Sequence, residues 1–351
     1  MPKLTETAYY TRKTIKYGSI TLLVLIIGRV VLTGAINYWK AAHPKPPPPP
    51  TVGFGQLPQL SFPNKESTEL SYTLETVSGS VPTISDRGTV YFMPIIRPNL
   101  LALQRATETA TNLSFVFEPQ SLSERLYRFS KSSPLPSRLD FDIVTGNFDL
   151  RVDWFTNPNF LQQRLLPSDA QAISEAQNYL GRADLMEKDL VAGESKITYL
   201  KGSGKGYQKT VSLSEADFIQ IDFFRKEIEP GIVSITSDPT EGIVRVTISG
   251  SRNQGERIVF VKYDYFPIDS LNFETYPIKS GQAAWEELIS GGGYIVSPPQ
   301  GGNQAIVRSI TIGYYDAFEP QNYFQPVYIF SGDKDFTAIV PAIDNTWIQQ
   351  E

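Results

Sequence analysis

A continuous apolar segment near the N-terminus constrains this chain more than any other feature. Residues 17–39 read YGSITLLVLIIGRVVLTGAINYW. As a helix rising about 1.5 Å per residue, the segment spans roughly 34 Å, enough to cross a hydrocarbon core of about 30 Å. Tyr17, Tyr38 and Trp39 stand at its ends, where aromatic side chains favour the membrane–water interface. The sequence therefore predicts a transmembrane helix, with the lipid bilayer as a partner of residues 17–39.

The charges around this segment predict its orientation. Basic residues are concentrated on its N-terminal side: Lys3, Arg12, Lys13 and Lys16 with Glu6 before it, and Lys40 and Lys45 after it. Because positively charged flanks stay in the cytoplasm, we expect a cytoplasmic tail at residues 1–16. The C-terminal part then lies outside a cell membrane that the chain crosses once.

The competing interpretation is a cleaved signal peptide. Thr33, Gly34 and Ala35 offer small residues at which a signal peptidase can cut. The apolar run from Ile20 to Ile36 is longer than the usual signal-peptide core of about 7–15 residues. Its length favours the permanent anchor.

Arg29 stands near the middle of the apolar segment. A charged residue at this depth costs about 2.5–3.5 kcal/mol on insertion scales. A tilted helix lets the long side chain reach the interface. The alternative is that Arg29 contacts an acidic residue on the transmembrane helix of another membrane or envelope protein.

Residues 40–63 are rich in proline and predict an extended linker. Five consecutive prolines, at positions 46–50, lack amide donors and favour polyproline II. Such a segment also resembles ligands of SH3-type grooves, but its place directly after an anchor favours a stiff stalk. His43 lies at the start of this stalk, where solvation is expected.

Composition excludes several classes of chemistry. The chain has no cysteine, and His43 is its single histidine. These counts exclude disulfides, thiolate-bound metals and a Ser-His-Asp triad, and no cofactor is expected. With 32 basic and 37 acidic residues overall, of which seven basic and one acidic precede residue 46, residues 46–351 carry a net charge of −11. This charge repels phosphate backbones, so nucleic acid is not an expected partner.

Beyond the linker the sequence predicts an α+β fold of antiparallel sheets with a few helices on one face. Residues 64–166 and 167–351 are expected to form two α+β units. Runs of β-branched and aromatic residues, most of them alternating with polar ones, predict strands at 70–77, 88–93, 139–145, 149–155, 197–200, 218–224, 243–249, 257–263, 306–314, 327–330 and 336–340.

Three segments predict helices. The first follows Pro98 and places Leu100 and Leu103 on one face. The second begins after Ser168, which forms a capping box with Gln171. The third begins after Ser280, buries residues 284, 285 and 288, and ends at Gly291.

Catalytic motifs are incomplete. Residues 201–206 (KGSGKG) resemble a phosphate loop but lack the final Ser or Thr. Residues 331–334 (SGDK) fit Ser-x-x-Lys but lie between two predicted strands. Both segments predict turns. Paired acids such as Glu286 and Glu287 leave a carboxylate-dependent, carbohydrate-active hydrolase as an alternative function.

An aromatic group near the C-terminus is the candidate partner surface. Pro326 removes a ladder donor, which places the following strand at a sheet edge or starts the strand at its first residue. An open edge here can accept a partner strand, although alternating aromatics also form sheet cores. The candidate residues are Tyr314, Tyr315, Tyr323, Phe324, Val327 and Tyr328.

The order of these C-terminal motifs resembles the YycH/YycI-like extracytoplasmic regulators, single-pass bacterial proteins with PepSY-like α+β units. The matching segments are 283–288 (AAWEEL), 310–315 (ITIGYY), 325–330 (QPVYIF), 336–338 (FTA) and 341–342 (PA). The resemblance implies a non-enzymatic protein that restrains a sensor kinase through membrane-helix contacts. The proline stalk and the unit at 64–166 depart from that pattern.

The sequence therefore predicts a membrane-anchored, extracytoplasmic, non-enzymatic binding or regulatory protein acting through protein–protein contacts. The hydrolase above and a passive stalked surface component are the alternatives.

Overall fold

The computed structural model describes residues 4–42, 48–64, 69–82, 85–94, 99–163 and 165–349. It divides into two compact units, residues 1–49 and 50–351, and each is described by itself.

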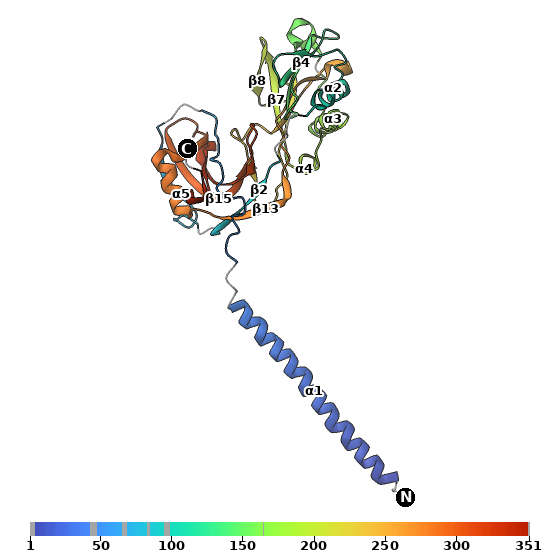
Figure 1. The fold of residues 1–351 in the computed structure, drawn as a ribbon, viewed down its shortest axis with the longest axis vertical. Coiled ribbons are helices and arrows are strands. Elements are labelled where there is room, and N and C mark those ends of the chain that lie inside the picture. The colour runs from blue at the N-terminus through green and yellow to red at the C-terminus, as the bar shows by residue number, and fades with distance from the viewer. Residues whose placement is uncertain are drawn as a thin grey trace. The chain divides into compact units, whose positions relative to one another are not determined.

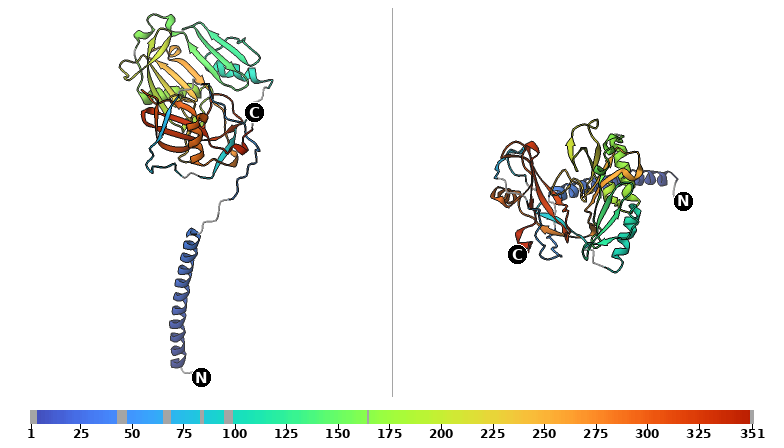
Figure 2. Two further views of the ribbon diagram at one scale, coloured as in Figure 1. Left: turned by 90° about the vertical axis from the view of Figure 1, so that its left-hand side faces the viewer. Right: turned by 90° about the horizontal axis from the view of Figure 1, so that it is seen from above.

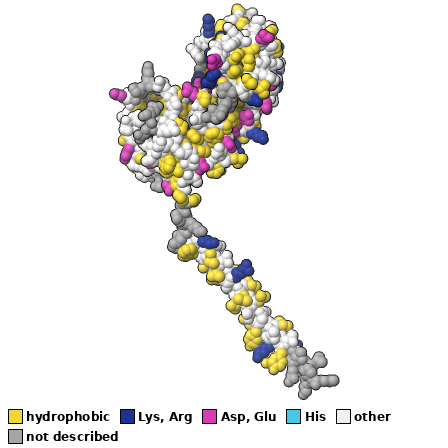
Figure 3. Space-filling view, viewed as in Figure 1, with side chains coloured by type: hydrophobic (Ala, Val, Ile, Leu, Met, Phe, Trp, Pro, Cys, Tyr) yellow, Lys and Arg dark blue, Asp and Glu magenta, His cyan; other side chains and the backbone are white. Residues whose placement is uncertain are grey.

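The first unit contains a single long helix, α1 (Leu4–Ala42) (Figure 1). Its middle is lined mainly by hydrophobic side chains with a few Lys and Arg (Figure 3). By length and composition this helix is able to cross a membrane, a property that signal sequences share. The hydroxyls of Thr21 and Thr33 donate to the carbonyls of Tyr17 and Arg29, at 2.9 and 2.7 Å. These polar groups are therefore satisfied within the helix, as a hydrocarbon environment requires.

The described residues of the second unit form three sheets. The largest has nine strands, all antiparallel. Their spatial order is β3 (Gln120–Ser121), β4 (Leu126–Lys131), β5 (Ser137–Asp142), β6 (Phe148–Val152), β12 (Ile258–Tyr263), β11 (Val244–Ser249), β9 (Phe218–Phe223), β7 (Ser195–Ser203) and β8 (Gly206–Thr210).

A six-stranded sheet is built mainly from the C-terminal part of the chain. Its order is β1 (Ser71–Leu74), β15 (Gln304–Tyr315), β17 (Pro326–Gly332), β18 (Thr337–Pro341) and β14 (Tyr294–Ser297), with β10 (Ser234–Ile235) also pairing with β15. The strands β1 and β10 run parallel to β15, and the other pairs are antiparallel. A third sheet contains β13 (Asp269–Pro277), β2 (Arg87–Phe92) and β16 (Tyr323–Phe324).

Helices cover one face of each large sheet. Three pack on the nine-stranded sheet (Figure 1), namely α2 (Ala102–Asn112), α3 (Asp169–Gly181) and α4 (Lys188–Val191). The six-stranded sheet is covered by α5 (Gly281–Glu287) and the π-helical turn Leu288–Gly292 that follows it. Short 3-10 helices lie at Trp154–Thr156, Phe160–Gln162, Gln254–Glu256, Asp333–Asp335 and Asn345–Trp347. We call the sheet face opposite the helices its open face.

The α+β class with mostly antiparallel sheets and few helices is confirmed. Every predicted strand has an observed counterpart. The capping box before α3 is present, with the Ser168 amide donating to Gln171 Oε1 at 3.1 Å. The hydroxyl of Ser280 accepts from the Ala283 amide at 3.1 Å and caps α5.

The predicted face of the first helix is wrong. Leu100 lies before α2 and is fully exposed, and Leu103 is 36% exposed. The buried face consists of Ala102, Ala106 and Ala110, because only small side chains allow the helix to lie close to the sheet. The predicted helix is observed, but its alanines and not its leucines form the buried face.

Two predicted boundaries differ from the structure. The division at residues 166 and 167 falls within the nine-stranded sheet, since β6 pairs with β12 across it. The second half of the predicted linker packs on the globular unit, where Leu57 is fully buried and bridges to Ile348. Alternating apolar residues in this half supply the contacts. Of the five prolines, Pro46 and Pro47 lie outside the described residues, as does His43.

Candidate functional site

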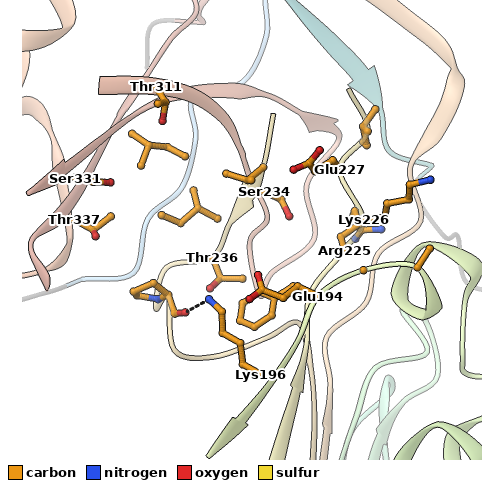
Figure 4. Close-up of a pocket in the computed structure, with 18 of the residues that line it drawn as sticks. Glu194, Lys196, Arg225, Lys226, Glu227, Ser234, Thr236, Thr311, Ser331 and Thr337 are labelled. Carbon is orange, nitrogen blue, oxygen red and sulfur yellow. Dashed lines mark hydrogen bonds between the residues drawn. The ribbon is translucent and has the colours of Figure 1, made fainter. Parts of the chain in front are cut away.

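A cavity of about 860 Å³ lies between the two large sheets. Figure 2 shows these sheets beside each other within the globular unit, and Figure 4 shows the cavity lining. We call this cavity the cleft. Its walls come from the start of β7, the segment 224–236 that joins the sheets, and the open face of β15, β17 and β18. Residues distant in the sequence therefore meet around one space.

Hydroxyl groups line the wall formed by the six-stranded sheet. Ser331 on β17 is directly opposite Thr337 on β18, and Thr311 on β15 is opposite Ile329. Since alternate residues of a strand share one face, Ser331 and Ile329 lie on the same side of β17. This wall offers three hydroxyls around an apolar centre.

The opposite wall carries charges of both signs. Glu194, Lys196, Lys226 and Glu227 line it and are exposed (Figure 4). The amine of Lys196 lies 4.5 Å from the centre of the Phe224 ring and donates to the Pro239 carbonyl at 3.4 Å. Two contacts of its amine therefore hold this lysine at the wall of the cleft.

Gly193 allows the turn after α4 to pack closely against the residues that follow β9 in this wall. A Cβ at this position would lie 1.9 Å from the Phe224 carbonyl oxygen, which no side chain permits. Glycine is needed here because the turn after α4 presses against the end of β9.

A buried ion-pair network holds the two sheets together behind the cleft. Arg225 is 5% exposed and donates to Asp316 at 3.0 Å and to Asp189 at 2.5 Å. Its guanidinium lies over the Tyr265 ring at 4.7 Å, and the Tyr265 hydroxyl donates to Asp189 at 3.1 Å. Burial by itself lowers the pKa of Arg225, but the two carboxylates outweigh it and raise that pKa above its ordinary value. Arg225 is therefore always charged.

A second buried network lies nearby. The hydroxyls of Tyr91 and Tyr314 both donate to Glu229 Oε1, at 3.0 and 2.8 Å. Burial, followed by the Glu229 charge, raises the pKa of Tyr91 to about 12 and also raises that of Tyr314. Both tyrosines are hydrogen-bond donors at physiological pH, and they position the segment that forms the cleft floor.

The arrangement suits binding. Among the described residues there is no group of three His, Cys, Asp or Glu side chains placed to hold a metal ion. In the same part of the chain, no hydrogen bond joins the hydroxyl of Ser331 or Thr337 to a carboxylate. The cleft presents hydroxyls, charges of both signs and apolar side chains, which are groups that can recognise a polar chain.

The predicted aromatic surface is corrected by the structure. Tyr314, Tyr315, Phe324, Val327 and Tyr328 are each at most 2% exposed. They belong to different clusters on both faces of the sheet. The sixth residue, Tyr323, is partly buried and packs on Phe54 with ring centres 4.9 Å apart.

The expected edge strand is central. The strand β17 lies between β15 and β18. Pro326 is its first residue, which is the other position that sequence reasoning allowed for a proline. The aromatic residues pack into clusters on both faces of this part of the sheet.

The glycine-rich motifs form turns. Residues 203–206 close the β7–β8 hairpin, with Gly204 at φ 59°. Residues 333–335 form a 3-10 turn between β17 and β18. Arg29 lies within α1 with its side chain exposed, and its contact with a partner stays a prediction.

The residues that line the cleft were missed by sequence reasoning. The sequence does indicate on which face of its strand Thr311 lies. It stands between Ile310 and Ile312, so it points to the face opposite to theirs. Nothing in the sequence indicates that Thr311 faces Lys196, since pairing between distant strands brings them together.

Comparison with known proteins identifies no family. No family model matches the chain, and no curated protein matches it. Similar solved structures include an uncharacterised protein from Eubacterium rectale ATCC 33656, with 9% identity, 74% of this chain and 84% of that chain covered, and a TM-score of 0.33. Another is the Bacillus megaterium YpeB C-terminal domain, with 10% identity, 73% and 96% coverage and a TM-score of 0.31. Sequence identities and TM-scores this low do not establish membership of a family, so the resemblance to YycH/YycI-like regulators stays a prediction.

Proposed function

We propose that this chain is a single-pass, extracytoplasmic, non-enzymatic regulatory protein that binds an extended segment of a protein partner in the cleft. The observation that carries the proposal is the lining of the cleft. Three hydroxyls and one apolar residue face a wall with two carboxylates and two amines. A peptide backbone hydrogen-bonds to hydroxyls, and its side chains pair with charges of either sign.

The size of the cleft supports a peptide ligand. A volume of about 860 Å³ lies within the range of about 300–1,000 Å³ found for ligand sites. The cleft is lined along its length by strand residues on one side and an irregular segment on the other. Such a groove accommodates an extended chain better than a compact solute.

The anchor supports a partner in the same membrane. A membrane anchor confines the chain to the bilayer, which raises its effective concentration toward other proteins of the same membrane. Arg29 is proposed to pair with an acidic residue of that partner, because the pair lowers the cost of each charge in hydrocarbon.

Site-specific photo-crosslinking in intact cells tests the cleft. A photoreactive phenylalanine analogue replaces Thr311, which is exposed on β15. Its matched control replaces Thr111, an exposed threonine on α2. We expect a discrete adduct from position 311 that is absent from position 111 and that diminishes when Lys196→Glu reverses a cleft charge. Failure of position 311 to give any adduct, or the same adduct from both positions, contradicts the proposal.

The transmembrane contact is tested separately. Arg29→Leu removes the charge and retains the helix, so we expect the crosslinked partner to remain membrane-bound but to co-purify at least several-fold less well with this chain. Unchanged co-purification excludes the role of Arg29. Added protease tests the topology, since the globular unit must be accessible from outside intact cells.

A further inference from the structure

A second cavity, about 590 Å³ in volume, lies on the open face of the nine-stranded sheet. Its lining comes from β5, β6, β12, β11 and the β7–β8 hairpin. Four basic side chains line it, against a single acid, Asp153: Arg138, Arg151, Lys205 and Arg245. We call it the cationic pocket. Its charge is opposite to that of the whole chain, which is −5.

Two of these arginines face each other directly. Arg138 on β5 is the cross-strand partner of Arg151 on β6. Like charges in this position repel and destabilise a sheet. Phe260 on β12 follows Arg151 in the same row, so Arg151 lies between Arg138 and an aromatic ring. The free protein tolerates this repulsion, which an anion bound beside Arg138 would reduce.

Internal carboxylates neutralise only part of this charge. Arg151 forms a bidentate pair with Asp149, with both contacts at 2.7 Å, and Arg245 pairs with Glu241 at 2.7 Å. For Arg138 and Lys205 no carboxylate lies within ion-pair distance in the described part of the chain. The pocket therefore has a surplus of positive charge.

Two buried polar atoms in this region lack protein partners. Arg245 Nε and Thr247 Oγ1 are inaccessible and form no hydrogen bond with any described residue. Thr247 is fully buried and lies in the sheet row between Phe260 and Gln220, both of which line the pocket. Because neither atom is accessible, neither can touch a molecule in the pocket, so the exposed cations and the aromatic rings are the groups that would contact a ligand.

Aromatic side chains complete the lining. Lys205 lies 5.4 Å from the Phe155 ring centre, and Arg151 lies 5.8 Å from that of Phe260. Trp154 donates to the Tyr207 hydroxyl at 3.2 Å, which holds both rings at the wall. A flat group fits between such faces.

We propose that the cationic pocket binds a small organic anion in which a carboxylate is carried on a planar ring. The carboxylate lies between Arg138 and Lys205, and the ring packs on Phe155 and Phe260. A pocket of this volume accepts a small molecule of this kind. The proposal does not depend on the function of the cleft.

Calorimetric titration of the full chain in detergent tests the ligand class. The probe is sodium benzoate, its neutral analogue is benzamide, and inorganic phosphate is the anion without a ring. We expect benzoate to bind at least tenfold more tightly than either, with affinity falling as salt is raised. Equal binding of benzamide overturns the role of charge, and equal binding of phosphate overturns the role of the ring.

Two variants test the location. Arg138→Gln should weaken benzoate binding at least tenfold while leaving the melting temperature unchanged or higher, because it removes the repulsion from Arg151. A purely structural arginine would lower the melting temperature instead. Lys205→Gln lies in an exposed hairpin and provides a second test that does not depend on the sheet.

The matched control is Arg182→Gln, an exposed arginine at the end of α3, which should bind benzoate as the native chain does. Native affinity in both the Arg138 and Lys205 variants overturns the proposal.

Discussion

At the scale of single residues, buried carboxylates make the stability of this fold depend on pH. Asp264 is 6% exposed, and its nearest cation, Lys262, is 3.5 Å away. Burial raises the pKa of Asp264 to about 6, against the opposing effect of Lys262. Burial also raises the pKa of Asp222, whose oxygens accept from the Gly242 amide and the Gln220 side chain.

The sign of this effect follows from proton linkage. Between about pH 4 and pH 6 the folded chain holds a proton on Asp264 that the unfolded chain has released, so this group stabilises the fold as the pH falls through that window. At pH 7 the charged, buried Asp264 instead costs about 3 kcal/mol.

We therefore expect Asp264→Asn to stabilise the chain at pH 7 by up to about 3 kcal/mol and to lose most of that advantage by pH 4. Urea denaturation of the full chain in detergent at several pH values measures both effects. Asp184→Asn, at an exposed position, is the control. A gain that is the same at pH 4 and pH 7 would contradict the assigned pKa.

Residue identity was only partly predictable from the sequence. The capping residues Ser168 and Ser280 were found because a cap is a local hydrogen bond within one turn of helix. The buried alanine face of α2 was missed. Whether Ala or Leu is buried depends on how closely the helix packs on the sheet, and the local sequence does not give that distance. The need for glycine at position 193 was missed as well, since the carbonyl it approaches belongs to Phe224, which is distant in the sequence.

At the scale of elements, the central position of β17 in its sheet determines what a proline substitution in this strand does to folding. Val327 is fully buried and pairs with Gly313 on one side and Pro341 on the other. Proline at an edge strand is tolerated, but in a central strand it removes a ladder hydrogen bond.

Val327→Pro should therefore prevent the globular unit from folding, rather than remove partner binding alone. Val327→Ala retains the backbone donor and should fold with a lower melting temperature. Far-ultraviolet circular dichroism and the yield of soluble, detergent-extracted protein distinguish the two. A native spectrum for the proline variant would show that β17 has a free edge.

Sequence reasoning was most successful in predicting individual strands and helices. Strand periodicity is local, so every predicted strand was found. Other strands were missed, among them the nine-residue β13 and the six-residue β4 as well as short strands such as β10 and β16. The segment after the prolines was expected to be part of a linker because its prolines and glycines dominate the pattern. Its apolar residues find partners only in the folded unit.

At the scale of the whole molecule, one arginine joins the two large sheets. Arg225 follows β9, and Asp316 follows β15. Their side chains are 1% and 2% exposed. Loss of one partner from such a buried pair leaves a charge without compensation.

Arg225→Ala should destabilise the globular unit by about 3–5 kcal/mol, because Asp316 stays buried and charged. Arg308→Ala is the matched control, since Arg308 also pairs with two acids, Glu75 and Asp333, but at the surface, where ion pairs contribute little. Urea denaturation of both variants measures the difference. Equal losses would show that the Arg225 network is not what holds the sheets together.

The sequence by itself determined the apolar helix, the α+β class, most strands and the helix caps. Each of these depends on residues within a few positions of one another, so periodicity and local hydrogen bonding are sufficient. Only the tertiary structure decided which faces are open, because strand pairing places Thr311 opposite Lys196 across the cleft and Arg138 beside Arg151 in the cationic pocket. Those juxtapositions arise from contacts between distant segments, which no local pattern of residues records.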